Sequence, residues 1–157
     1  MTNMVYREAT PADIKAIQVV RNSVKENMLS DPALVTDQDC EDYMTTRGKA
    51  WVCVIDGEIV GFSYIDLKDN NVWALFVHPG FAGQGIGKSL HRIMLDWYCS
   101  VTDKTIWLGT DPATKAAVFY RLQGWKEVGM HGSKEIKFEM TSHDWTTKAN
   151  NRMTDPA

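Results

Sequence analysis

The sequence predicts a mixed α/β fold in which helices cover both faces of a sheet. Two observations predict it. Apolar residues recur at three- and four-residue spacings in several segments, and short β-prone runs bounded by turn residues lie between them. The 157 residues are 44% hydrophobic and 24% charged, a composition typical of a globular domain. We therefore expect a single domain over residues 1–141 and a polar, aperiodic, frayed tail over 142–157.

The first elements predicted are a strand over Met4–Glu8 and a long helix. The helix starts at Thr10-Pro11-Ala12-Asp13, where a hydroxyl cap, a proline and a first-turn acid follow one another. An apolar stripe from Ile14 onward predicts that it continues to Asn27 or Met28. A second, shorter helix is expected after Thr36, because Asp39 stands at the position of a capping-box acid.

Strands and two further helices follow. Asp56-Gly57 is a strong hairpin signal between two apolar runs, and Gly124 ends the last predicted helix. The predicted elements are strands Trp51–Ile55, Ile59–Leu67 and Val72–Val77, a helix from Ile86 to Tyr98, a strand Thr105–Leu108, a helix Ala113–Leu122, and a hairpin of Trp125–Met130 with Glu135–Met140.

Charge and cysteine content exclude several classes of function. The net charge of −3 gives no general attraction to nucleic acid, and we expect none as a partner. The three cysteines form no C-x-x-C pair, so we expect neither a metal site nor a disulfide framework. The N-terminus lacks the features of a leader and no run is long enough to span a bilayer, so we expect a cytoplasmic protein without membrane contact.

A glycine-rich turn, Gly83-Gln84-Gly85-Ile86-Gly87, lies between an apolar strand and a predicted helix. The first N–H groups of a helix have no intrahelical partner, and the helix dipole favours negative charge there. Such a turn therefore suits a phosphate, although glycines also serve purely structural turns. The spacing matches neither a P-loop nor a G-x-G-x-x-G motif, so a nucleoside triphosphate is not implied.

The segment Ala82 to Gly87 resembles the GNAT superfamily signature Arg/Gln-x-x-Gly-x-Gly/Ala, with Ala82 replacing the leading residue. A second landmark, Ala116 to Trp125, is similar to the family element A-x-x-F-Y-x-x-x-G-F/W. The resemblance covers residues 4–140. It implies a GNAT fold, with a central, mostly antiparallel, splayed sheet of about seven strands flanked by about four helices.

The resemblance also implies a site for acetyl-CoA. Main-chain groups of Phe76 and Val77 would meet the pantetheine arm, and Lys88 would add charge. Lys115 would reach a phosphate of the cofactor, although a lysine at such a position is more often simply solvated. Ala113 stands where many members of the family have an asparagine, so that cofactor contact would be missing. The pyrophosphate would lie against Gly83, Gln84, Gly85, Ile86, Gly87 and Lys88.

Acyl transfer from a thioester needs a proton for the leaving sulfur and a free amine. Tyr120 matches the family's usual acid, and the alternative is that it only packs beside Phe119. The Val77 N–H would stabilise the oxyanion. His78 is a candidate base, with turn capping as its alternative, and a water chain or Glu26 stays open for the same role.

In the fold that the resemblance implies, the acceptor amine would meet the first two helices and the loop that joins them, with Trp73 of the third middle strand as a wall of its pocket. Candidate residues are Arg21, Asn22, Glu26, Asn27 and Trp73. The first four of these residues lie on one polar face of the predicted helix. Any solvent-exposed helix has such a face, so the alternative is that these residues are only solvated.

Three functions follow from these observations. The first is an N-acetyltransferase that moves acetyl from acetyl-CoA to a primary amine of a small molecule or peptide by direct attack. The second is a non-catalytic acyl-CoA-binding sensor or interaction protein, and the third an unrelated nucleotide-binding protein. For assembly we expect a homodimer, the commonest form of oligomer.

Overall fold

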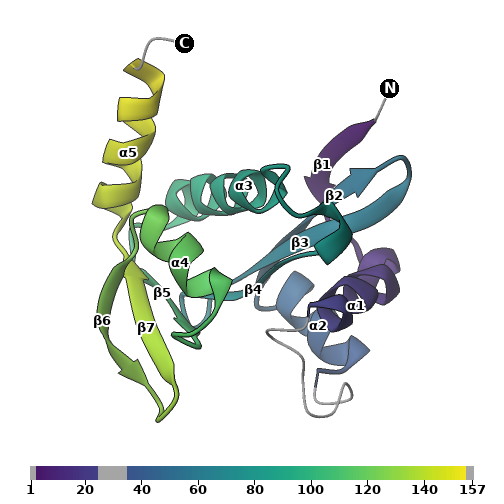
Figure 1. Ribbon diagram of the computed structural model, residues 1–157, viewed down its shortest axis with the longest axis horizontal. Helices are drawn as coiled ribbons and strands as arrows, with labels where there is room; N and C mark the ends of the chain where they lie inside the picture. The colour runs from purple at the N-terminus through teal and green to yellow at the C-terminus, as the bar shows by residue number, and fades with distance from the viewer. Residues whose placement is uncertain (1–2, 25–34, 155–157) are drawn as a thin grey trace. The chain divides into compact units, whose positions relative to one another are not determined.

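The computed structural model describes residues 3–24 and 35–154 (Figure 1). Within these residues the chain forms seven β-strands, five α-helices and two short 3-10 helices, which confirms the mixed α/β prediction. It divides into two compact units, one up to Asp96 and one from Trp97. None of the described helices has the length and hydropathy needed to cross a bilayer.

The first unit contains a four-stranded antiparallel sheet whose strands pair in chain order. The β2–β3 hairpin turns at Asp56 and Gly57, whose φ values of 49° and 85° are those of the predicted tight turn. The strands are β1 (Met4–Glu8), β2 (Gly48–Ile55), β3 (Glu58–Asp66) and β4 (Asn71–Val77).

Two helices, α1 (Ile14–Ser23) and α2 (Asp37–Thr45), pack on one face of this sheet (Figure 1). A 3-10 turn, η1 (Pro11–Asp13), leads into α1, and the predicted Thr36–Asp39 capping box is present at α2. The buried core between helices and sheet contains Ile14, Ile17, Val20, Cys40, Met44, Ala50, Val52, Phe62, Tyr64 and Ala74.

The predicted end of α1 at Asn27 or Met28 is wrong. Val24 has an extended backbone (φ −90°, ψ 106°), so the helix ends at Ser23. The Ser23 hydroxyl donates a 2.6 Å hydrogen bond to the Val20 carbonyl, a local bond that competes with helix continuation. Residues 25–34 lie outside the described part of the chain.

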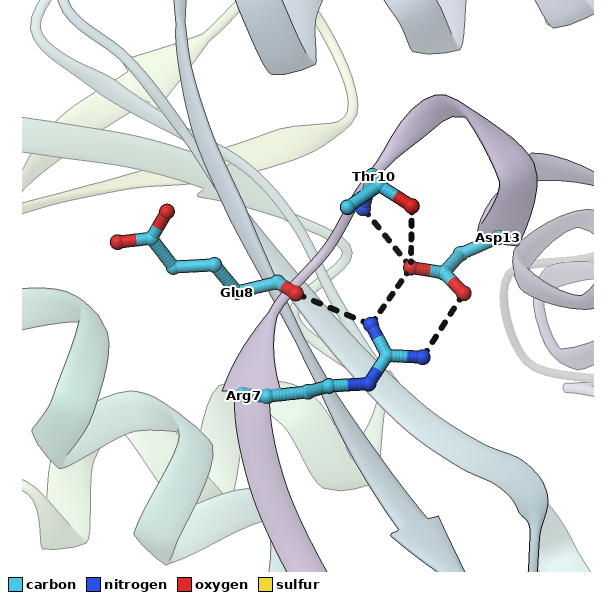
Figure 2. A network of polar contacts seen from close by, with 4 residues as sticks. All are labelled: Arg7, Glu8, Thr10 and Asp13. Atoms are coloured by element: carbon cyan, nitrogen blue, oxygen red, sulfur yellow. Dashed lines mark hydrogen bonds and ion pairs between the residues drawn. The ribbon is translucent and has the colours of Figure 1, made fainter.

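A polar network fixes the junction between β1 and α1 (Figure 2). Arg7 binds the Asp13 carboxylate through two nitrogens, at 2.8 and 2.9 Å, and the Thr10 N–H donates to the same carboxylate at 2.8 Å. Arg7 also donates to the Glu8 carbonyl at 3.0 Å. The Arg7 guanidinium lowers the pKa of Asp13, so this side chain is charged at neutral pH and holds the start of α1 in place.

The opposite face of the sheet meets α3 (Ile86–Val101) at the helix N-terminus. A Cβ on Gly61 of β3 would lie 3.1 Å from side-chain atoms of both Ile86 and Leu90, so glycine permits this close packing. Ile86, Leu90 and Met94 are fully or almost fully buried, as the predicted stripe requires. Because Gly61 alternates with Phe62, α3 and α1 lie on opposite faces of β3.

The second unit holds the rest of α3 and a three-stranded antiparallel sheet with β7 in the middle. Helix α4 begins at Lys115, because the Thr114 hydroxyl accepts from the Ala117 N–H and acts as its N-cap. The elements are β5 (Ile106–Thr110), α4 (Lys115–Leu122), β6 (Lys126–His131), β7 (Glu135–Met140) and α5 (Ser142–Thr154).

The expected frayed tail is instead helix α5. Its start is capped by Thr141, whose hydroxyl accepts from the Asp144 N–H at 3.0 Å. Trp145 is 2% exposed and anchors the first turn of α5 in the core. One buried indole was too weak a periodic signal to predict the helix.

Candidate active site

The turn between β4 and α3 has a backbone that glycine must supply. A short 3-10 turn, η4 (Pro79–Phe81), follows β4, and then Gly83 and Gly85 have φ values of +80° and +76°. L-residues pay about 1–2 kcal/mol to adopt this left-handed conformation. No atom lies within 4 Å of a Cβ built on either glycine, so backbone geometry rather than crowding selects the residue type.

This turn presents main-chain donors at the start of a 16-residue helix. The first α-helical hydrogen bond runs from the Ser89 N–H to the Gly85 carbonyl, at 3.0 Å. The N–H groups of Ile86, Gly87 and Lys88 precede that bond and have no intrahelical acceptor. Gln84 and Lys88 are exposed there, while the Ile86 side chain is buried, so Ile86 can offer only its main chain. The geometry fits an anion such as a diphosphate.

The two candidate residues on β4 differ in their main-chain bonding. The His78 N–H donates to the Val60 carbonyl at 2.8 Å, and Phe62 pairs with Phe76 in the same register. Antiparallel ladders alternate, so the main chain of Phe76 bonds to β3, while the N–H and C=O of Val77 point away from β3. Val77 therefore suits the predicted main-chain role better than Phe76.

His78 caps a turn in the structure. Its Nδ1 accepts a 3.0 Å hydrogen bond from the Gly80 N–H, and its ring lies 6.0 Å from that of Phe81. A neutral histidine has one lone pair for accepting a proton, and here this bond uses it. The geometry therefore favours turn capping, the alternative that the sequence left open, over the role of base.

Tyr120 lies on α4 in the second unit and is 6% exposed. Its ring contacts Phe119, Trp125 and Phe138 at centroid distances of 5.3, 5.6 and 6.3 Å. Burial raises the pKa of Tyr120, so the phenol is protonated at neutral pH and can act as a proton donor. Lys115 is exposed at the first position of the same helix.

Arg21 is 7% exposed, in contrast to the solvated face expected for it. Its guanidinium carbon lies 4.9 Å from the ring centroid of Trp73, 5.3 Å from Phe76 and 5.5 Å from Phe62. Asn22, one residue on, is exposed, and the predicted acceptor residues Glu26 and Asn27 lie outside the described residues. The structure thus brings together Arg21 and Trp73 from the predicted acceptor set.

Tyr43 of α2 belongs to this aromatic cluster and was missed by the sequence analysis. Its ring stacks on Trp73 with centroids 4.1 Å apart and an interplanar angle of 9°. No local pattern links Tyr43 to Trp73, because the contact depends on how α2 packs on β4. For Arg21 a signal existed: it follows Ile14 and Ile17 at the spacing of the apolar stripe, and so shares their buried face.

The fold and the turn before α3 define an α/β protein in which a positive-φ glycine turn leads into the N-terminus of a helix. A family model described as an acetyltransferase (GNAT) domain matches residues 46–127, about half of the chain. The chain belongs to this GNAT family. Mycothiol acetyltransferase of Thermobispora bispora is 31% identical over 101 residues, which cover 61% of this chain and 33% of that protein.

Solved structures share the fold at low sequence identity. PaiA N-acetyltransferase of Thermoplasma acidophilum, in complex with coenzyme A, has a TM-score of 0.78 at 14% identity, covering 88% of this chain and 99% of that chain. The ribosomal-protein-S18-alanine N-acetyltransferase of Escherichia coli has a TM-score of 0.69 at 16% identity, covering 88% and 92% respectively. These likenesses confirm the predicted GNAT fold.

Metal ligands are not grouped in the described part of the chain. There, no three His, Cys, Asp or Glu side chains are placed to hold an ion together. Cys40 and Cys53 are buried as free thiols, and Cys99 is half-buried.

Proposed function

We propose that this protein transfers an acetyl group from acetyl-CoA to a primary amine of a small molecule or peptide. The single observation that carries the proposal is the positive-φ turn at Gly83 and Gly85, which leads into the first-turn N–H groups of α3, groups without an intrahelical acceptor. Membership of the GNAT family and the coenzyme A complex of PaiA support acetyl-CoA as the donor. The cytoplasm is the proposed compartment and a homodimer the proposed assembly.

The donor's diphosphate would lie against the main chain of residues 83–88. Lys88 would add positive charge from the exposed side of the first helical turn, and Lys115 would add a second charge from α4. Val77 would offer the main-chain groups that do not bond to β3. Most of these contacts come from the main chain. The binding therefore does not depend on the Arg or Gln of the family signature, which is Ala82 in this chain.

The reaction proposed is a direct displacement. The amine nitrogen bonds to the thioester carbon, the C–S bond breaks, and its electron pair stays on sulfur. The Val77 N–H would stabilise the oxyanion, and Tyr120 would donate its proton to the leaving sulfur. Because the His78 lone pair caps a turn, we propose that the proton lost by the amine passes to water.

Replacing the phenol of Tyr120 tests the enzymatic proposal. Removing a general acid costs roughly 100- to 10,000-fold in rate, so Tyr120→Phe should lower kcat by at least about 100-fold. Free thiol released from acetyl-CoA is the readout, with an amine panel of polyamines, amino acids and peptides as acceptors. Tyr6→Phe is the matched control in the first unit and should keep the wild-type rate.

The outcome also separates the enzyme from an acyl-CoA sensor. A sensor would be stabilised by acetyl-CoA, by about 2.7 kcal/mol at 100 times its dissociation constant, yet would release no thiol with any amine. Equal rates for Tyr120→Phe and wild type would remove the phenol from the mechanism.

A further inference from the structure

Arg21 is a buried cation, and two of its three nitrogens make no hydrogen bond within residues 3–24 and 35–154. Its Nε and Nη2 atoms are inaccessible to solvent and have no hydrogen-bond partner among the described residues. Nor does Arg21 form an ion pair with any carboxylate of residues 3–24 or 35–154. Burying a charge without a partner is among the costliest arrangements in a protein, so the site needs an explanation.

Aromatic contacts explain the position of the guanidinium but not its bonding. Phe62, Trp73 and Phe76 surround it at 4.9 to 5.5 Å, within the range of cation–π attraction. Cation–π contacts do not supply hydrogen-bond acceptors, so the N–H groups of Nε and Nη2 still need them. Burial lowers the pKa of Arg21, yet arginine stays charged at neutral pH.

The positions of Nε and Nη2 indicate which kind of acceptor could satisfy both nitrogens at once. Nε and Nη2 form one side of the guanidinium fork, and together they present two roughly parallel N–H bonds. A carboxylate accepts both at once, which is the bidentate geometry that arginine favours.

The location separates this anion from the donor's phosphates. Arg21 and Phe76 lie on the face of the sheet that carries α1 and α2. Val77, the next residue, faces the other side, since a Cβ on Gly87 of α3 would lie 3.7 Å from its side chain. The anion at Arg21 therefore approaches β4 from the face opposite the one on which α3 packs.

We propose that Arg21 binds a carboxylate of the acceptor, so that the substrates are amines that also carry a carboxylate, such as amino acids or peptides. This rests on the acetyl transfer proposed above. Trp73 and Phe76 hold the guanidinium in place, and the Tyr43–Trp73 stack supports Trp73. Polyamines, which have no carboxylate, are then poor substrates.

Matched amine pairs test the inference. Glycine, β-alanine and dialanine are each compared with their amides, using acetyl-CoA as donor and free thiol as readout. Breaking a buried charged pair costs roughly 2–5 kcal/mol, so kcat/KM should favour at least one carboxylate by about 30-fold or more. Arg21→Met should abolish this preference for the carboxylate over its amide, and Arg21→Lys should restore the preference only in part.

Controls separate the possible failures. Lys15→Met removes an exposed cation from the same helix and should keep the preference. Good turnover without carboxylate preference overturns the role of Arg21 and leaves acetyl transfer intact. Absence of both acetyl-CoA binding and turnover instead overturns the proposed function.

A binding measurement tests the site without turnover. Thermal unfolding of the protein with coenzyme A should shift upward with N-acetylglycine more than with N-acetylglycinamide, and Arg21→Met should remove that difference. Equal shifts for the two ligands in the wild type contradict the proposal. A purely structural arginine would show a lower melting temperature for Arg21→Met and unchanged selectivity.

Discussion

Burial determines what Tyr120 and Arg21 can do, and it does so in different ways. A buried phenol is stable as the neutral acid, so its surroundings keep the proton that the proposed reaction needs. A buried guanidinium stays charged, and two nitrogens of Arg21 have no partner in the described part of the chain, which is the basis of the proposed carboxylate ligand. At both residues the chemistry follows from neighbouring rings, which the sequence does not place beside them.

Buried tyrosines predict how stability changes at alkaline pH. Burial raises the pKa of Tyr98 to about 12, and it also raises the pKa values of Tyr64 and Tyr120. The folded protein keeps these protons while the unfolded chain loses them near pH 10. Their contribution is complete below pH 10 and is lost as the pH rises, by about 1.4 kcal/mol per pH unit for each residue.

Urea unfolding between pH 9 and 12 measures this effect. Tyr98→Phe should flatten the decline in the free energy of unfolding, because phenylalanine does not titrate. An identical slope for Tyr98→Phe and wild type would show that Tyr98 ionises equally well in the folded state.

Elements with local capping signals were predicted well, and those fixed by tertiary contacts were not. The capping box of α2 and the Asp56-Gly57 hairpin formed as expected, since short-range bonds and φ preferences decide both. The end of α1 was misplaced because its apolar stripe continues past Ser23 while the backbone does not. Helix α5 was missed because its main anchor is one buried residue, Trp145.

The junction between β1 and α1 gives a prediction at this scale. Asp13→Asn removes the bidentate partner of Arg7, and we expect it to lower the free energy of unfolding at pH 7 by about 1–2 kcal/mol. The pKa of Asp13 is lowered, so its contribution is present above about pH 4 and is lost as the pH falls through the lower folded value. The difference in the free energy of unfolding between wild type and Asp13→Asn should therefore become smaller as the pH is lowered.

Denaturant titrations at pH 7 and pH 3 check this. The control is Glu8→Gln, which breaks the neighbouring ion pair between Glu8 and Lys49. Because the Glu8 carboxylate is mostly exposed, this change should lower the free energy of unfolding by no more than about 0.5 kcal/mol. If both variants lost the same free energy of unfolding, the burial of Asp13 would not strengthen its ion pair with Arg7.

For the whole molecule, the mixed α/β fold and the family could be predicted because their landmarks are short motifs with local causes. The glycine turn is one of these, since Gly83 and Gly85 need positive φ. The acceptor side was predicted only in outline. Arg21 and Trp73 were named, but the contact between them depends on how α1 packs on the sheet.

The account as a whole depends on the turn before α3 binding coenzyme A. Gly85→Ala puts a Cβ on a residue with φ of +76°, and Gly57→Ala does the same at +85° in the β2–β3 hairpin. Both sites have open space around the added atom, so the two changes impose similar backbone strain. They differ in whether the strained backbone belongs to the proposed phosphate site.

Isothermal titration calorimetry with coenzyme A compares the three proteins most directly. We expect the wild type and Gly57→Ala to bind with equal affinity, and Gly85→Ala to bind about 5- to 30-fold more weakly, because the 1–2 kcal/mol of strain falls on the binding loop. No binding heat with the wild type, or equal affinities for all three proteins, would contradict the account.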